Sequence, residues 1–242
     1  MNQPGFLKKQ VHHAIAAFKD FRHAAFYKLI LRPGVAPIQK MGDALCPWVI
    51  APQILSASSV VYSAGVGNNI SFERELAQTI GCDIVLLDPS PAAQITMEKP
   101  ENALSRFHFF PVALAGHQGS LSLTPPSNGD LENGCWSHST DTASSESIAC
   151  DSVESVMKRH GHHHVDLLKL DIEGAEYDVI RHIIERRIDV CQICVEFHHF
   201  MGLPHIQRKH TIAAIFSLLR HGYLLISKDG ENYTFVRKDA LV

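Results

Sequence analysis

One strand-to-helix segment constrains the fold of this chain more than any other. It begins with a mostly apolar run, Val165–Leu170, which has the length and composition of a buried strand. Asp171 and Glu173 follow where this strand should end, and Gly174 precedes a helical pattern over residues 175–185. In open α/β sheets, ligands bind beyond the carboxyl ends of the strands. We therefore expect the two acids at a position where chemistry takes place.

Alternating strand and helix patterns extend on both sides of this segment. Asp229-Gly230 separates the last two strand-like runs, which is a strong hairpin signal. The pattern predicts an α/β domain with a doubly wound, mostly parallel sheet that ends in an antiparallel hairpin. The predicted strands are 60–63, 83–87, 107–114, 119–123, 165–170, 190–196, 223–227 and 233–237. The predicted helices are 70–80, 92–99, 151–160 (with Asp151 as N-cap), 175–185 and 206–220.

The first 52 residues differ in character from the rest of the chain. An amphipathic pattern interspersed with basic residues covers 5–31, and a Pro-rich stretch covers 32–52. We expect a helical cap that packs on the main domain, followed by a linker; a helix lying on a membrane surface is the alternative. The chain is thus divided into an N-terminal extension, 1–52, and a ligand-binding domain, 53–242.

Composition excludes several classes of protein. With 242 residues, of which 45% are hydrophobic, the chain suits one α/β domain with a modest extension. A net charge of -3 and the lack of a Lys/Arg stripe disfavour nucleic acid as the partner. No apolar run approaches the roughly 20 residues that cross a bilayer, and the N-terminus lacks a secretory pattern. We expect a cytoplasmic protein.

The cysteines and the histidine-rich turn do not predict a redox or metal centre. Cys191 and Cys194 form the one CxxC pair, but they lie in a predicted strand, where residues i and i+3 point to opposite faces. They are expected to be core cysteines. The histidines of His160–His164 precede a strand and are expected in a solvated turn.

A glycine turn and an acid indicate a nucleotide-like cofactor. Gly65 and Gly67 lie between a predicted strand and helix, where glycine lets the backbone approach a ligand and the helix N-terminus attracts an anionic group. Asp88 follows the next strand, 23 positions after Gly65 (88 − 65), close to the roughly 20 expected for an acid that binds a ribose. Helix capping is the alternative role for Asp88. The third glycine of the dinucleotide motif would fall at Ile70, so NAD is disfavoured.

Several segments together resemble the FkbM-like methyltransferases, which use S-adenosylmethionine (SAM) as methyl donor. They are Val61–Ser71, Leu86–Pro91, Phe110–Gly116, the string Lys169-Leu-Asp-Ile-Glu-Gly-Ala-Glu176, and Val195-Glu-Phe-His198. The resemblance covers about residues 59–200 and implies a seven-stranded, Rossmann-like class I methyltransferase sheet. It also implies a set of cofactor-binding residues, Ser63, Gly65, Gly67, Asn69, Asp88, Pro89, Val112 and Ala113, with the backbone of the last two at the adenine edge.

Methyl transfer to a hydroxyl group needs positioning and a base or Lewis acid. Asp171 ends the strand nearest the expected methyl group, so it is our candidate for orienting the acceptor or removing its proton. Glu173, Glu196 and His198 are candidates to join it. Such a cluster could also hold Mg²⁺, Mn²⁺ or Zn²⁺, although we favour catalysis without a metal. Glu176 is expected to be a surface or salt-bridged scaffold residue.

The sequence thus predicts a SAM-dependent methyltransferase, most simply an O-methyltransferase for a small molecule or a sugar. The alternatives are an NAD-type oxidoreductase on the same sheet and a catalytically silent SAM-fold binding module. The predicted loop 124–148 is rich in Ser, Thr, Gly and Asn and is expected to close over the acceptor, with Trp136 as a stacking face. Neither the acceptor nor the oligomeric state can be read from the sequence.

Overall fold

The computed structural model describes residues 25–126, 136–140, 145–203 and 205–241. Most of the expected N-terminal helix, 5–31, lies outside the described residues, although residues 25–30 are helical. Parts of the expected loop 124–148 also lie outside them.

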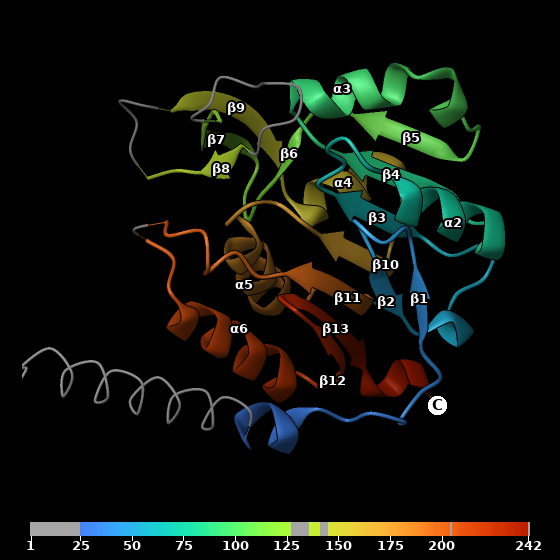
Figure 1. Ribbon diagram of the computed structural model, residues 1–242, viewed down its shortest axis with the longest axis vertical. Helices are drawn as coiled ribbons and strands as arrows, with labels where there is room; N and C mark the ends of the chain where they lie inside the picture. Colours follow the sequence, from blue (N-terminus) through green and yellow to red (C-terminus); the bar gives the residue numbers. More distant parts are fainter. Residues whose placement is uncertain (1–24, 127–135, 141–144, 204, 242) are drawn as a thin grey trace, which may run out of the picture.

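A central sheet organises the described part of the chain. Its seven strands follow the order β12-β13-β11-β10-β3-β4-β5 (Figure 1). Neighbours from β11 to β5 are parallel, whereas β13 is antiparallel to both β11 and β12. The predicted α/β class with a mostly parallel sheet is therefore confirmed. The strands are β3 (Val61–Ala64), β4 (Ile84–Leu87), β5 (Phe107–Phe110), β10 (Val165–Leu170), β11 (Val190–Glu196), β12 (Tyr223–Asp229) and β13 (Asn232–Arg237).

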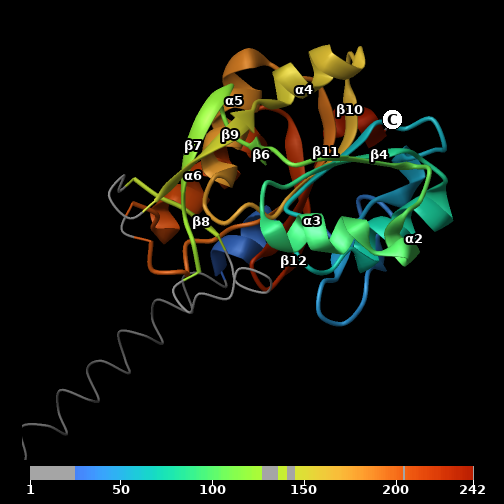
Figure 2. The ribbon, with the colours of Figure 1, turned by 90° about the horizontal axis from the view of Figure 1, so that it is seen from above.

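Helices cover both faces of this sheet (Figure 2). One face carries α2 (Ser71–Ile80) and α3 (Pro91–Glu98), and the other carries α4 (Val153–His160), α5 (Glu176–Arg186) and α6 (Arg208–Arg220). Short 3₁₀ turns lie at Pro52–Ile54, Pro100–Asn102 and Lys238–Leu241. In the part of the chain that the structure describes, no helix is both long and apolar enough to cross a membrane.

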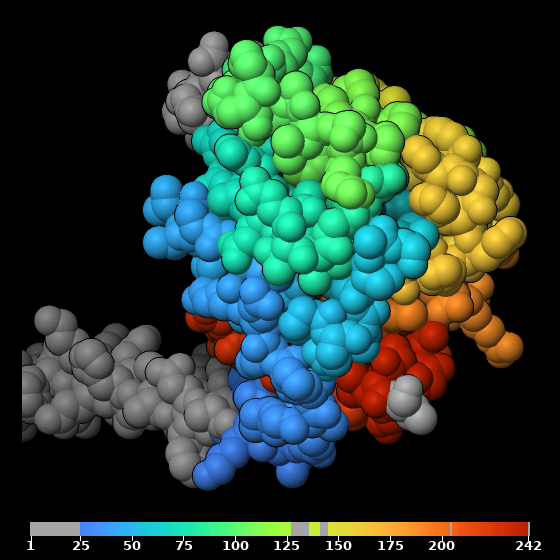
Figure 3. Space-filling view, turned by 90° about the vertical axis from the view of Figure 1, so that its right-hand side faces the viewer, coloured from blue at the N-terminus to red at the C-terminus, as the bar shows by residue number. Residues whose placement is uncertain are grey.

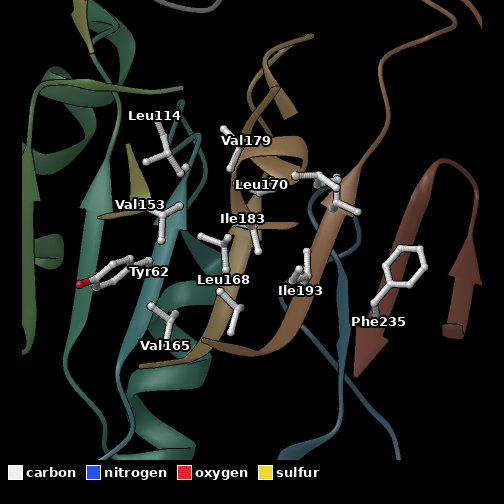
Figure 4. Packing of buried hydrophobic residues seen from close by; sticks show 14 of the residues in the cluster. Tyr62, Leu114, Val153, Val165, Leu168, Leu170, Val179, Ile183, Ile193 and Phe235 are labelled. Carbon is white, nitrogen blue, oxygen red and sulfur yellow. The ribbon is translucent and has the colours of Figure 1, made fainter. Parts of the chain in front are cut away.

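The core lies on both faces of β10, which explains why its sequence is almost continuously apolar. Leu168 and Leu170 pack in the cluster under α4, α5 and α6 (Figure 4), whereas Leu167 packs in the cluster under α2. This split follows from the alternation of side chains along a strand. Lys169 shares the α2 side with Leu167 and is 1% exposed. A charged residue in that position needs a specific partner.

The stretch that the sequence assigned to a linker contains a small sheet. β1 (Gln39–Met41) pairs antiparallel with β2 (Trp48–Ile50). Trp48 is 2% exposed and packs against Phe72 of α2, with 6.3 Å between the ring centroids. Figure 3 shows the blue N-terminal segment lying against the teal atoms of α2. Residues 39–50 therefore complete the core on this face of the sheet.

A second sheet corrects two sequence predictions. β6 (Ala113–Leu114), β7 (Gly119–Thr124), β8 (Ser137–His138) and β9 (Glu146–Asp151) form it in the order β6-β9-β7-β8. The predicted strand 107–114 is wrong because it is split between two sheets at Pro111, which has no N–H for a ladder. The prediction that 124–148 is entirely loop is also wrong. β9 pairs with β7, and the polar sequence of β9 does not indicate this long-range pairing.

The N-terminus of α4 also differs from the prediction. Ser152, not Asp151, is the N-cap, and its Oγ accepts a hydrogen bond from the backbone N–H of Ser155. Asp151 is instead the last residue of β9, and its carboxylate pairs with Arg159. Asp151 therefore belongs to the strand and not to the helix cap.

Truncating Trp48 tests whether residues 39–50 belong to the cooperative core. Trp48→Ala should lower the free energy of unfolding by about 3–5 kcal/mol, because it removes a buried aromatic side chain and leaves a cavity. Leu45→Ala is the control, since Leu45 is 89% exposed and its truncation should change stability by less than about 0.5 kcal/mol. Urea unfolding measures both. Equal stabilities of the two variants would contradict this packing.

Candidate active site

The carboxyl ends of four adjacent strands lie at one edge of the sheet. The register pairs Ala64 of β3 with Leu170 of β10 and with Leu87 of β4, and pairs Leu170 with Val195 of β11. A cavity of about 340 Å³ opens at this edge. Its lining includes the glycine turn, the residues after β4 and β10, and the second sheet: Gly65, Gly67, Asn69, Asp88, Pro89, Ala113, Leu121, Leu123, Trp136, Lys169, Asp171, Ile172 and Glu173.

Gly65 brings the glycine turn against the end of β10. Its φ is +86°, and a Cβ at this position would lie 1.7 Å from the backbone oxygen of Asp171. Any side chain there would force the two backbones apart. Glycine at 65 is therefore required for the turn to meet Asp171.

Asp88 closes the turn from the other side. Its Oδ2 accepts hydrogen bonds from the backbone N–H groups of Val66 (2.8 Å) and Gly67 (2.9 Å). Its Oδ1 accepts one from Ser90 at 2.8 Å. Asp88 is 8% exposed and lines the cavity. The carboxylate therefore holds the glycine turn in shape. Oδ2 already accepts two hydrogen bonds, and Oδ1 keeps one acceptor site for a ligand hydroxyl.

A buried ion pair lies beneath the turn. Lys169 Nζ donates to the Gly65 carbonyl oxygen at 2.6 Å and lies 3.2 Å from Glu73 Oε1 on α2. The same Glu73 oxygen accepts a hydrogen bond from Ser63 Oγ at 2.6 Å. Glu73 and Asp171 raise the pKa of Lys169 despite its burial, so the ammonium stays charged. This network fixes the carbonyl side of the turn.

An acid cluster surrounds His198 at the ends of β10 and β11. His198 Nε2 lies 3.5 Å from Asp171 Oδ1, 3.3 Å from Glu173 Oε2 and 3.9 Å from Glu196 Oε2. His198 is 2% exposed, whereas the side chains of Asp171 and Glu196 are 24% and 28% exposed. Asp171, Glu196 and His198 each offer a possible metal-ligand atom, and these atoms lie within 4.8 Å of one another.

Glu176 supports this cluster from below. It is fully buried, so it is not on the surface, and its contact with His198 fits the salt-bridged alternative of the prediction. Its Oε1 accepts a hydrogen bond from the backbone N–H of His198 and its Oε2 accepts one from Gly174. The buried carboxylate therefore ties the start of α5 to the residue after β11.

The surroundings of Asp171 and Glu196 shift the pKa values of these two carboxyl groups in opposite directions. Burial, and then the negative charge of Asp171, raise the pKa of the Glu196 carboxyl to about 7. Burial also disfavours ionised Asp171, but His198 and Lys169 outweigh it and hold the pKa of Asp171 below its ordinary value. Burial opposes the charge on His198, yet contacts with Asp171 and Glu176 raise its pKa to about 11. Divergent pKa values in one carboxyl pair are typical of acid-base sites.

The second sheet contacts the turn after β10. Glu173 has a φ of 52°, which is uncommon for a residue with a side chain, and its carbonyl oxygen accepts a hydrogen bond from the His138 N–H of β8. Leu121, Leu123 and the half-buried Trp136 form an apolar wall with Ile172. Among the described residues, the buried Nε1 of Trp136 has no hydrogen-bond partner. The wall lines one side of the cavity.

Most of the residues that the sequence singled out line the cavity or adjoin it. Two of the predicted cofactor-binding residues, Ser63 and Val112, are not among the residues that line the cavity. Ser63 is fully buried and bonds Glu73, because the strand turns its side chain towards α2, and Val112 precedes the lining residue Ala113. Glu196 and His198 do not line the cavity, but they lie next to Asp171, which does. The sequence reasoning missed Lys169 and Glu73, although a lone lysine in an apolar strand was a usable signal.

The chain is similar to one family model, to two curated proteins and, weakly, to one solved structure. A family model described as the methyltransferase FkbM domain matches residues 57–225. The probable methyltransferase-like proteins 24 of Rattus norvegicus and Homo sapiens are 25% and 26% identical over 66% and 63% of this chain. The chain spans only 41% and 36% of their lengths. The crystal structure of M. jannaschii TYW2 in complex with AdoMet aligns with a TM-score of 0.33 and 10% identity, covering 83% of this chain and 84% of that chain.

The family match extends from before β3 into β12 and includes both the glycine turn and the acid cluster. It covers well over half of the chain. The chain belongs to the FkbM methyltransferase family.

Proposed function

We propose that this protein transfers a methyl group from SAM to a hydroxyl group of a small molecule or a sugar. The proposal rests on one cavity that is lined by the glycine turn, by Asp88 and by two acids of the cluster, Asp171 and Glu173. Its volume, about 340 Å³, falls within the range of small-molecule sites. The family assignment supports methyl transfer as the reaction.

The cavity residues fit SAM by their chemistry. A Cβ added at Gly67 would meet no other atom within 4 Å, so the turn is open to a ligand there. Asp88 presents Oδ1 to a ribose hydroxyl, and the start of α2 attracts the methionine carboxylate. Leu87, Ala113 and Leu114 offer apolar surface to the adenine ring. When bound, SAM supplies an electrophilic methyl group on a sulfonium.

The acid pair prepares the acceptor. Asp171 lines the cavity and is ionised at neutral pH, since its pKa is lowered, so it can accept a hydrogen bond from the acceptor hydroxyl and orient its oxygen. Glu196 lies behind Asp171 and has a pKa of about 7, which suits a group that takes up a proton at neutral pH. His198, held between the acids, fixes their positions.

The walls of the cavity favour an uncharged acceptor. Leu121, Leu123 and Trp136 provide apolar surface, as for the face of a sugar or an aromatic ring. Among the described lining residues the one cation is Lys169, and it is already bonded to Gly65 and Glu73. We therefore infer a neutral acceptor, without a phosphate group.

Asp88→Ala tests the cofactor site. Loss of the carboxylate that holds the glycine turn and binds a ribose hydroxyl should weaken binding of S-adenosylhomocysteine by about 10- to 100-fold in calorimetry. Asp83→Ala is the matched control, because Asp83 is exposed at the opposite end of β4, and it should bind like the wild type. If neither the wild type nor the control binds S-adenosylhomocysteine or SAM, the proposal fails.

Asp171→Asn tests the chemical step. The variant should keep its affinity for S-adenosylhomocysteine within about threefold, while methylation of a hydroxyl acceptor falls by about 10²- to 10⁴-fold. Formation of S-adenosylhomocysteine with a panel of sugars and phenols measures the rate, and Glu185→Gln on the exposed side of α5 is the control. A wild type that binds SAM yet methylates nothing in the panel, as Asp171→Asn does, would favour a binding module.

Glu196 should titrate near neutrality in protein treated with a chelator. Its folded pKa, about 7, lies above the value of about 4.3 in an unfolded chain. The stabilisation from its protonated form is therefore complete below about pH 4.3 and is lost as pH rises through about 7. Infrared spectroscopy should show a carboxylic acid band that disappears with a midpoint near pH 7 and is missing in Glu196→Gln. A midpoint near the ordinary pKa of glutamate, about pH 4, would contradict this assignment.

A further inference from the structure

We propose that Asp171, Glu196 and His198 form a binding site for a divalent transition-metal ion beside the cavity. The inference deepens the proposed function and rests on it in one respect, because Asp171 both lines the cavity and belongs to the cluster. The binding itself rests on the geometry of the cluster alone, so it can be tested without a methyl acceptor.

The donor atoms lie close to the spacing that a metal requires. Bonds of about 2.1 Å from a metal to N and O ligands place adjacent donors roughly 3.0–3.4 Å apart. His198 Nε2 lies 3.5 Å from Asp171 Oδ1 and 3.9 Å from Glu196 Oε2. Side-chain rotations that move these atoms by a few tenths of an ångström close the difference. Glu173 Oε2, 3.3 Å from the same nitrogen, is within reach as a fourth ligand.

His198 has carboxylates on both sides of its ring, which is the arrangement that a metal-binding histidine needs. A histidine that binds a metal through one ring nitrogen usually donates the N–H of the other to a carboxylate, which sets its tautomer. His198 Nδ1 faces Glu176 Oε1 at 3.4 Å and makes no hydrogen bond of good geometry, although the side chain is only 3% exposed. Nε2 points to the other three acids. The buried Glu176 thus stands where the supporting carboxylate belongs.

The charge of the cluster favours a cation. Four carboxylates, those of Asp171, Glu173, Glu176 and Glu196, surround one imidazole. The nearby ammonium of Lys169 lies 4.0 Å from Asp171 but 3.2 Å from Glu73, so its charge is shared with a fifth acid. Partly buried like charges repel each other strongly. A dication offsets this repulsion more completely than a proton on His198 does.

The ligand set indicates which ions fit. Carboxylates suit Mg²⁺ and Mn²⁺, and imidazole suits Zn²⁺ and other later transition metals. Two carboxylates and one imidazole therefore favour Mn²⁺ or Zn²⁺ over Mg²⁺. The ion takes the place of the proton on Nε2, because a metal-bound histidine is neutral at that nitrogen. Beside a bound hydroxyl, such an ion supplies a Lewis acid.

Titration with MnCl₂ tests this site. The 242-residue protein, treated with EDTA and desalted, is titrated at about pH 8, where ligands are more readily deprotonated, while electron paramagnetic resonance measures the free Mn²⁺ signal. We expect saturable binding of one ion per chain, which ZnCl₂ competes away. Glu196→Gln should weaken binding by at least about 10-fold, and Glu176→Gln, through the orientation of His198, by about 10- to 100-fold. Glu185→Gln, whose carboxylate is exposed on α5, should bind as the wild type does.

The outcomes separate this proposal from the cofactor proposal. Circular dichroism of the same samples reports whether each variant is folded, and their affinity for S-adenosylhomocysteine reports on the proposed cofactor site. Binding of S-adenosylhomocysteine without saturable Mn²⁺ or Zn²⁺ binding overturns the metal site and leaves SAM as the cofactor. Metal binding that is equally strong in wild type and Glu196→Gln also overturns it, because the ion would then lie elsewhere. Metal binding without S-adenosylhomocysteine binding supports the site and contradicts the cofactor.

Discussion

The contact between the Gly65 and Asp171 backbones is the constraint on which the site depends. Two strands that are adjacent in the sheet but about a hundred residues apart in sequence end at this point, and their following turns touch without a side chain between them. The proposed cofactor turn and the acid cluster are therefore parts of one rigid edge. A methyl donor and an acceptor need this proximity more than any other contribution from the protein.

Buried charge supports that edge from beneath. Lys169 uses its ammonium to hold the Gly65 carbonyl, and Glu73 balances it from α2. Breaking such a pair is costly because the remaining charge stays buried without a partner. Trp48 covers the ammonium, with its ring centroid 5.3 Å from Nζ. The small sheet of residues 39–50 thus contributes to the geometry of the cavity as well as to the core.

The parts of the fold with a local signal could be predicted, and those made by long-range pairing could not. Both faces of the strand Val165–Leu170 are buried, and its sequence is therefore almost continuously apolar. β9 is polar and becomes a strand only by pairing with β7, so no periodicity marks it. Asp171 and Glu196 could be proposed from the sequence because ligands bind beyond the carboxyl ends of strands. Which way Ser63 points, and that Glu176 is buried, depend on α2 and α5 and needed the structure.

The second sheet has a consequence for how this domain can diversify. It is built from one continuous stretch, residues 113–151, and it meets the main sheet's acids chiefly through the His138 hydrogen bond to Glu173 and the packing of Ile172. The turn that faces the proposed cofactor is built from other segments. Substitutions at Leu121, Leu123 and Trp136 can therefore reshape the apolar wall of the cavity while the glycine turn, Asp88 and the acid cluster keep their sequence. A change of acceptor then needs no change in the segments that form that turn.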